Sequence, residues 1–149
     1  MKKILCLTAL LVSFLFGSAF AETIGVVDFD RVVDSYSRVK SVSDEISDKY
    51  AEIQRYSLDK EREYKKLTTP LERKNFEEAT ARELNKKQEA YLRLKEKKEA
   101  EIDTAIKNAI KQVAMSNQVD TIVEKSVVFF GGIDLTDKVI KALNSASAK

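Results

Sequence analysis

Helix-breaking residues are almost absent from a stretch of about 85 residues, between positions 34 and 118. The stretch contains a single proline, Pro70, and no glycine. A segment of this length without breakers is either disordered or helical, and here apolar residues return at a helical spacing. One series recurs every seven residues, with a break only at position 60: Val32, Val39, Ile46, Ile53 and Leu67. Such a repeat keeps one stripe of a helix facing a partner helix, so the sequence predicts a coiled coil.

The single proline divides this helical stretch near residues 68–70. Thr69 can cap a helix, Pro70 suits the first helical position, and Glu72 stands where a capping box needs an acidic side chain. One alternative is a kink within a single rod. The residues after Pro70 carry an apolar stripe that can face the first one, which favours an antiparallel hairpin with Thr69 and Pro70 at its tip. This predicted hairpin, residues 34–118, is called the arm.

The segment before the arm, residues 22–33, is expected to form a strand and the start of a helix. Residues 23–29 are a short β-branched run, typical of a strand that is buried on both faces. Gly25 within this run indicates a bulge or a close backbone approach. Asp30 is expected to cap the helix that follows.

The segment after the arm, residues 119–149, is expected to form a β-hairpin and a final helix. Residues 119–123 and 127–130 are apolar runs separated by a polar turn and followed by two glycines. This pattern predicts a β-hairpin, although the first run can also be read as the end of the long helix. Asp134 and Asp137 then have the spacing of a capping box, which predicts a helix from there through residue 143.

Together these elements predict an α+β protein, with a small body of short strands from both chain ends and a long helical arm inserted between them. The body has few apolar side chains to offset the chain entropy, and its strand edges need covering. We therefore expect an obligate oligomer whose strands pool into one shared sheet. The candidate interface residues are the apolar strand residues Ile24, Val26, Val27, Val127, Val128, Phe129 and Phe130.

Residues 1–21 have the pattern of a secretory signal peptide. A basic start at Lys2 and Lys3 is followed by an apolar run over residues 4–16 and by the small-x-small sequence ending at Ala21. The alternative is an anchoring N-terminus that stays attached. Removing two lysines from the 26 basic residues leaves 24, which equals the 24 acidic residues, so the mature chain is expected to be neutral. It also contains neither histidine nor cysteine, because Cys6 is the only cysteine.

This composition argues against an enzyme. Nucleophile–base pairs of the usual kinds need histidine or cysteine, and no glycine-rich phosphate-binding loop is present. We expect no catalytic, cofactor or metal site, since glutamates on a charged helix are far more often solvated than paired at a site. A nucleic-acid partner is not expected either, because glutamates interrupt the lysine clusters and export separates the protein from nucleic acid.

Aromatic and large apolar side chains are spread along the predicted arm. They are too scattered for a dense core, so side chains that the hairpin leaves uncovered can make weak contacts with a bound protein. The alternative is that the hairpin seam consumes them. The candidates for contact with a bound protein are Tyr50, Tyr56, Tyr64, Phe76, Leu84 and Tyr91.

The start of the mature chain, the tip and the end of the chain resemble the Skp/OmpH family of periplasmic chaperones. The similar stretches are residues 24–32, 65–72, 119–130 and 134–140. The resemblance implies a homotrimer with a small β-barrel body. It implies three helical hairpins around a cavity that holds unfolded outer-membrane β-barrel proteins without ATP, and it leaves room for a transient contact with a membrane surface. One departure is the neutral mature chain, because the best-known members are strongly basic.

Two functions from different classes are therefore carried forward. The first is an ATP-independent holdase of the periplasm that cages unfolded outer-membrane proteins. The second is a structural coiled-coil protein that spaces or tethers envelope components. A spacer needs a regular, well-filled seam, whereas lysines interrupt this one at Lys60, Lys95 and Lys98. The sequence favours the cage.

Overall fold

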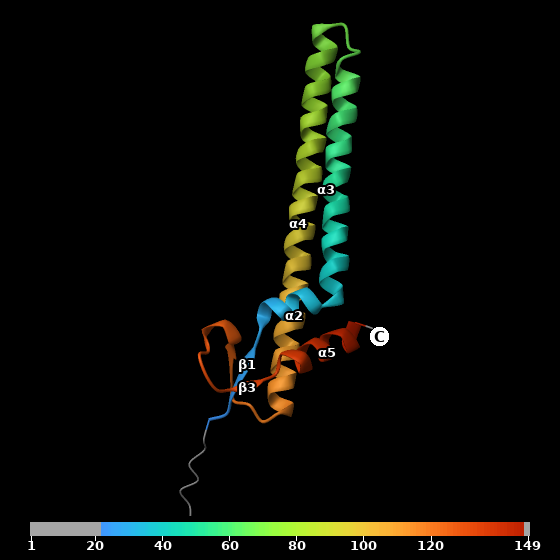
Figure 1. Ribbon diagram of the computed structural model, residues 1–149. Coiled ribbons are helices and arrows are strands. Elements are labelled where there is room, and N and C mark those ends of the chain that lie inside the picture. Colours follow the sequence, from blue (N-terminus) through green and yellow to red (C-terminus); the bar gives the residue numbers. More distant parts are fainter. Residues whose placement is uncertain (1–21, 148–149) are drawn as a thin grey trace, which may run out of the picture.

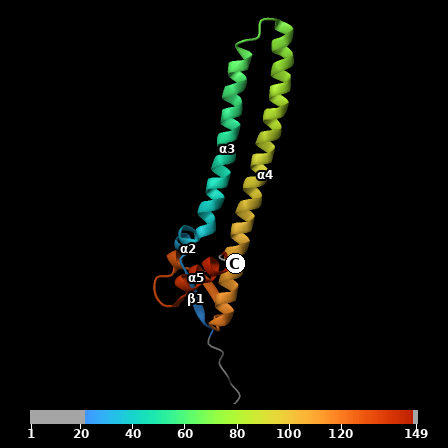
Figure 2. The same cartoon turned by 90° about the vertical axis from the view of Figure 1, so that its right-hand side faces the viewer.

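A computed structural model describes residues 22–147 and shows a long helical hairpin standing on a small body (Figure 1). Helix α3 (Ser37–Tyr64) runs outward and helix α4 (Pro70–Ser116) returns beside it, as two perpendicular views show (Figures 1 and 2). The prediction of a helical hairpin with a small sheet made from both chain ends is confirmed. The predicted signal peptide, residues 1–21, lies outside the described residues. No helix in the described part combines the length and the apolar character that a membrane span requires.

The chain reverses between the two arm helices over residues 65–69, and two local devices shape the turn. Thr69 and Glu72 form a complete capping box: the Thr69 Oγ1 accepts a bond of 3.3 Å from the Glu72 amide, and the Thr69 amide donates to Glu72 Oε2 at 3.1 Å. The Arg73 guanidinium donates two bonds, of 3.1 and 2.9 Å, to the carbonyl of Leu67. Both devices use residues close in sequence, so the turn needs no contact from elsewhere.

Replacing Thr69 by Ala is expected to lower the free energy of unfolding by about 1 kcal/mol or less, because one exposed helix cap is lost. Urea unfolding followed by circular dichroism measures the change. Most of the loss should come from fraying at the start of α4, which leaves the body intact. A loss of several kcal/mol would mean that the turn is packed against another part of the molecule.

The sheet of the body has three parallel strands in the order β2-β1-β3. The central strand, β1 (Ile24–Val27), comes from the beginning of the chain, and its neighbours, β2 (Thr121–Glu124) and β3 (Ile133–Asp134), come from the end. The predicted β-hairpin is therefore wrong. Both later strands run parallel to β1 on opposite sides of it, so they cannot pair with each other.

The segment between β2 and β3 also differs from the prediction. Lys125–Val127 form a single 3-10 turn, η2, and residues 128–132 continue as an irregular loop. Gly131 and Gly132 have φ values of +92° and +84°, a region in which only glycine is unstrained, and they turn the chain back toward β3. The second apolar run is thus not a strand in this chain, because the single chain offers it no partner strand.

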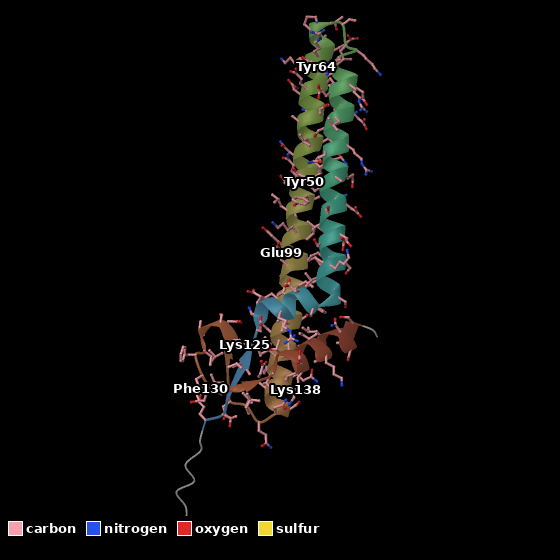
Figure 3. All side chains as sticks on the ribbon, viewed as in Figure 1. Tyr50, Tyr64, Glu99, Lys125, Phe130 and Lys138 are labelled. Carbon is pink, nitrogen blue, oxygen red and sulfur yellow. The ribbon has the colours of Figure 1, made fainter. Side chains whose placement is uncertain are left out.

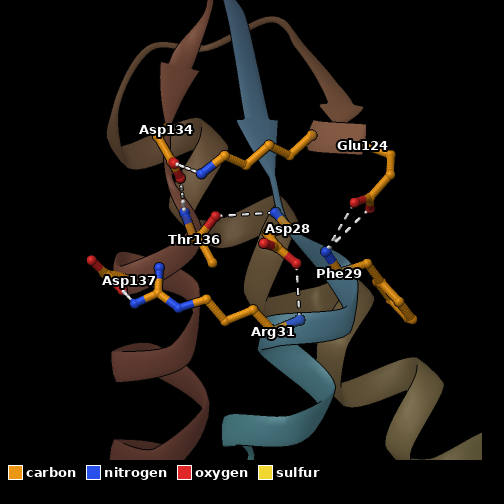
Figure 4. Close-up of polar contacts among 8 residues, drawn as sticks. Asp28, Phe29, Arg31, Glu124, Asp134, Thr136 and Asp137 are labelled. Carbon is orange, nitrogen blue, oxygen red and sulfur yellow. Dashed lines mark hydrogen bonds and ion pairs between the residues drawn. The ribbon is translucent and has the colours of Figure 1, made fainter. Parts of the chain in front are cut away.

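The two short body helices begin differently from the prediction, although both are capped by aspartate. In α2 (Phe29–Ser35) the cap is Asp28 and not Asp30: the Asp28 Oδ1 accepts a bond of 2.9 Å from the amide of Arg31 (Figure 4). Asp30 lies inside the first turn, too late to cap it. Helix α2 ends at Ser35, so the first arm helix does not continue from residue 34 as expected.

The last helix, α5 (Thr136–Ser147), also lacks the predicted capping box. Asp134 Oδ1 accepts from the amide of Thr136 at 3.0 Å, whereas Asp137 forms an ion pair with Arg31 at 2.7 Å (Figure 4). The helix starts two residues later than predicted and runs four residues beyond Leu143. Its apolar face packs into the body, where Val139 and Leu143 are buried.

The core of the body lies where α2, α4 and α5 meet the sheet. Helix α4 passes from the arm into the body without a break and contributes buried residues from Ile106 to Ala114. The most deeply buried side chains include Val27, Val32, Ile106, Leu135 and Val139. The buried hydroxyl of Thr136 accepts from the amide of Asp28 at 3.0 Å, which fastens α5 to the end of β1.

Gly25 lies in the centre of this packing, and its close approach to other residues was expected. A Cβ atom at this position would lie 2.7 Å from Cδ1 of Ile122, 2.9 Å from Cγ1 of Val119 and 3.1 Å from Cδ1 of Leu135. We expect Gly25→Ala to lower the free energy of unfolding by about 2 kcal/mol, because three closely packed side chains, two of them buried, must move together. Urea unfolding measures this loss. An unchanged unfolding midpoint would show that the core rearranges without cost.

Candidate functional site

Three shallow apolar hollows lie along the seam between the two arm helices. The base hollow, about 420 Å³, is lined mainly by apolar side chains: Phe29, Val33, Val39, Val42, Ile46, Tyr91, Ile102 and Ile106. The middle hollow, about 420 Å³, includes Tyr50, Ile53 and Leu58. The tip hollow, about 380 Å³, includes Tyr64, Phe76 and Leu84. Tyr64, Tyr50 and Glu99 are labelled in Figure 3, one for each hollow from tip to base.

All three hollows lie along the seam where the two arm helices face each other. On α3 many of their lining residues recur at intervals of three and four: Val39, Ser43, Ile46, Tyr50, Ile53, Ser57, Lys60 and Tyr64. On α4 they follow the same spacing: Glu77, Ala81, Leu84, Gln88, Tyr91, Lys95, Glu99, Ile102 and Ile106. Residues three and four apart lie on one face of a helix. The hollows therefore form one interrupted apolar strip, here called the arm face.

The arm face brings together five of the six residues that the sequence suggested for contact with a bound protein. Their rings also pack across the hairpin: the centroids of Tyr50 and Tyr91 are 5.8 Å apart, and those of Tyr64 and Phe76 are 6.3 Å apart. Tyr50 nevertheless keeps 51% of its surface exposed. These side chains pack in the seam and also remain partly exposed. The two alternatives drawn from the sequence, contact with a bound protein and packing in the seam, are therefore compatible.

Tyr56 is the sixth candidate, and it does not line any of the three hollows. Its ring lies under two ammonium groups, with Lys60 Nζ 5.6 Å and Lys87 Nζ 5.2 Å from its centroid. Cation–π contacts of this kind hold Tyr56 within the hairpin. It is therefore the weakest of the six as a contact residue.

Lysines occupy positions in the seam that a regular coiled coil gives to apolar residues. Lys98 pairs with Glu45 at 2.7 Å and Lys87 pairs with Glu52 at 3.2 Å, both across the hairpin. Lys60 pairs with Glu63 on its own helix at 2.6 Å, and this bond raises the pKa of Lys60. The pKa of Glu52 is lowered, mainly by its bonds to Lys49 and Lys87. Ion pairs thus replace part of the apolar packing between the helices.

Full burial of side chains in the arm is confined to its inner half. On α3 the buried residues are Val42 and Ile53, and on α4 burial begins at Ile106. Between residues 54 and 105 no side chain is buried. The outer part of the arm consequently has little core of its own, and its apolar side chains remain partly accessible to another molecule.

A second exposed apolar surface lies on the body. It is called the body patch and consists of Ile24, Val127, Phe129, Phe130 and Ile133. Phe129 and Phe130 are essentially fully exposed, at 105% and 94%, and Phe130 is at the outer edge of the body (Figure 3). Of the other predicted interface residues, Val128 is half-buried, and Val26 and Val27 are already buried within the chain's own core.

Ion pairs and hydrogen bonds hold the loop that carries the body patch (Figure 4). Lys125 pairs with Asp134 at 2.7 Å, so the two ends of the loop are joined. The bonds from Lys125 and Thr136 lower the pKa of Asp134 well below its usual range. The Glu124 carboxylate accepts from the amide of Phe29 with both oxygens at 3.2 Å. The exposed aromatic side chains are thus presented by a defined loop.

No set of three or more potential metal ligands clusters within residues 22–147. The three hollows of the arm face have mostly apolar surfaces, and charged side chains such as Lys60, Lys95 and Glu99 line them as well. Sites for small ligands instead combine an apolar pocket with convergent polar groups that fix orientation. The arm face is suited to many weak apolar contacts along an extended partner.

Fold and surfaces together define a helical-hairpin protein that presents an interrupted apolar strip on its arm and an aromatic patch on its body. The family model of OmpH-like outer membrane proteins matches residues 23–143. The chain belongs to this OmpH-like family, as the resemblance of the sequence predicted.

Other comparisons find similar chains among solved structures. No curated protein matches the chain. A crystal structure from Caulobacter crescentus CB15, described as an outer membrane chaperone (OmpH-like), is similar at 14% identity. The match covers 84% of this chain and 85% of that one, with a TM-score of 0.39.

Proposed function

We propose that this protein is an ATP-independent chaperone of the periplasm that holds unfolded outer-membrane β-barrel proteins and prevents their aggregation. The arm face carries this proposal, because it spreads partly exposed aromatic and aliphatic side chains along the seam of a long arm. Membership of the OmpH-like family supports it. The N-terminal pattern of residues 1–21 is consistent with export.

Binding on the arm face would consist of many weak contacts. Each side chain of the partner that covers tens of Å² contributes about 1 kcal/mol, at roughly 25 cal/mol per Å² of apolar surface. Several such contacts along one arm, and more on neighbouring arms, sum to useful affinity without a fixed bound structure. An unfolded chain can then exchange contacts and leave without a nucleotide-driven step.

In a homotrimer, three arms would together enclose a cavity. Strands β2 and β3 are the edges of the described sheet, and the body patch leaves two aromatic side chains fully exposed beside them. Exposed edges and apolar patches of this kind mark surfaces for association. We assign this surface to contacts between copies, and we take the number of three and the closed barrel from the resemblance to the Skp/OmpH family.

The alternative of a coiled-coil spacer is less consistent with the seam. A stiff rod needs continuous knobs-into-holes packing, whereas this arm has no buried side chain between residues 54 and 105. Lys60, Lys87 and Lys98 lie in the seam instead. A weakly packed arm is better suited to adapt to partners of different size.

The direct test measures aggregation of an outer-membrane β-barrel protein diluted from urea. Light scattering is followed with and without the purified chain that begins at residue 22, in the absence of nucleotide. We expect suppression at a stoichiometric excess of chaperone trimer, and no effect of added ATP. Equal scattering with and without the chain would refute the chaperone function and favour the spacer.

A further inference from the structure

A one-residue break separates α2 from the arm helix α3. Tyr36 has extended backbone angles, φ −82° and ψ 107°, and its side chain is buried in the body core. The heptad-like stripe of the sequence continues through this position, so the repeat itself gives no sign of a break. Something outside the two helices must therefore stabilise their free ends.

Asn144 of α5 supplies the missing bonds. Tyr36 occupies the N-cap position of α3 and offers no side-chain cap. In its place, the Asn144 Oδ1 accepts from the Ser37 amide and from the Ser37 hydroxyl, both at 3.0 Å. On the other side of the break, the Asn144 Nδ2 donates to the carbonyl of Ser35 at 3.0 Å. One side chain thus caps the end of α2 and the start of α3 together.

The orientation of the Asn144 amide follows from its partners. The Ser37 amide can only donate and the Ser35 carbonyl can only accept, so the oxygen must face Ser37 and the nitrogen must face Ser35. Aspartate at this position would keep the cap on α3, but it would place a second acceptor against Ser35. The site therefore requires both halves of the amide.

The other contacts that fix the position of α3 along α4 lie mostly at the surface. Helix α4 is continuous from the tip into the body, whereas α3 has only two buried residues, Val42 and Ile53. Beyond these, two pairs of partly exposed rings, Tyr50 with Tyr91 and Tyr64 with Phe76, connect the helices. Ion pairs of Arg38, Lys87 and Lys98 also connect them, and long side chains of this kind tolerate displacement. The register of the arm face depends on α3 and α4 together, because both line every hollow.

We propose that Asn144 is a positioning residue that holds α3 in register against α4 and so determines the shape of the arm face. This inference rests on the proposed function only in its consequence, which is the shape of the hollows that a bound unfolded protein (the client) contacts. The C-terminal helix then acts on a surface that it does not itself line. Loss of the amide frees the base of α3 to shift by as much as one helical turn, about 5 Å.

The test measures the axial distance between the two arm helices by double electron–electron resonance. Spin labels are placed at Arg55→Cys on α3 and Met115→Cys on α4, because both side chains are exposed. The distance between the two labels reports the position of α3 along α4. The chain that begins at residue 22 carries the labels, and it has no native cysteine because the only one is Cys6. Labelled chains are mixed with an excess of unlabelled chains, so that distances between copies of an oligomer do not contribute.

Two variants remove the contact from opposite sides. Asn144→Ala removes the amide, and Ser37→Pro removes both donors on α3 while leaving α5 untouched. Proline is well tolerated at this first helical position, and the extended Tyr36 before it is compatible with a following proline. Ser145→Ala, an exposed neighbour on α5, is the matched control.

We expect a single narrow distance distribution for the unaltered chain and for Ser145→Ala. Both Asn144→Ala and Ser37→Pro should broaden or shift it by about 5 Å, with helix content unchanged. An unaltered distribution in Ser37→Pro would overturn the proposal, even if Asn144→Ala shifts it, because the contact with α3 would then be dispensable. The measurement contains no client, so its outcome is independent of the aggregation test.

Discussion

Replacing Phe129 and Phe130 together by Glu is expected to convert the oligomer into folded monomers. Both side chains are fully exposed in the single chain, so their loss removes no contact within it. Two buried phenylalanines contribute about 400 Å² per chain, about half of the roughly 800 Å² that each partner buries in a standard interface. Four carboxylates or more would then meet in an apolar interface without cationic partners, which costs several kcal/mol per interface.

Sedimentation velocity measures the assembly, and circular dichroism reports the fold of the dissociated chain. The control is Leu71→Glu, which places a glutamate on an exposed apolar residue at the tip of the arm. It should leave the assembly intact. If the variant with both phenylalanines replaced sediments like the unaltered protein, the body patch is not the contact between copies.

Replacing five residues of the arm face by Gln is expected to weaken client holding at least about tenfold, the equivalent of about 1.4 kcal/mol. The five are Tyr50, Tyr64, Phe76, Leu84 and Tyr91. Glutamine is a good helix former, so the arm keeps its helical propensity while the apolar strip is lost. Binding of a labelled outer-membrane protein measures the affinity, and the oligomer should persist.

The matched control replaces Tyr56, Leu71 and Leu92 by Gln, since these apolar side chains lie outside the three hollows. It should bind clients nearly as well as the unaltered protein. Raising the salt concentration to about 0.5 M should also have little effect, because a neutral chain has little long-range attraction to lose. If salt abolishes binding and the five-site variant binds normally, the lysines of the arm are the binding site.

The arm could be predicted from sequence because its determinants are local and repeated. The spacing of apolar residues indicates two facing helices, and the capping box at Thr69 and Glu72 lies within four residues. The scattered aromatic and large apolar side chains chosen from the sequence also included five residues of the arm face. The sequence did not reveal which of them share a hollow, because the relative rotation of α3 and α4 depends in part on lysines whose partners lie across the hairpin.

The body was predicted less well because its partners are distant in sequence. The apolar run before Gly131 is typical of a strand, yet both edges of β1 are already taken by β2 and β3. Asp28 caps α2 in place of Asp30 because β1 ends at Val27 and the helix starts directly after it. The break at Tyr36 is stabilised by Asn144, more than 100 residues away, and no local pattern reveals such a contact.

The central strand β1 has a consequence for the order in which the chain folds. Hydrogen bonds of the residues that flank it join positions about 100 apart, such as Thr23 with Asp120 and Asp28 with Thr136. The arm hairpin closes through contacts much nearer in sequence and should therefore form first, since loop-closure entropy disfavours distant contacts. Until residues 133–134 have paired with it, β1 has an open edge. Each new copy thus passes through a stage in which it is itself exposed to aggregation.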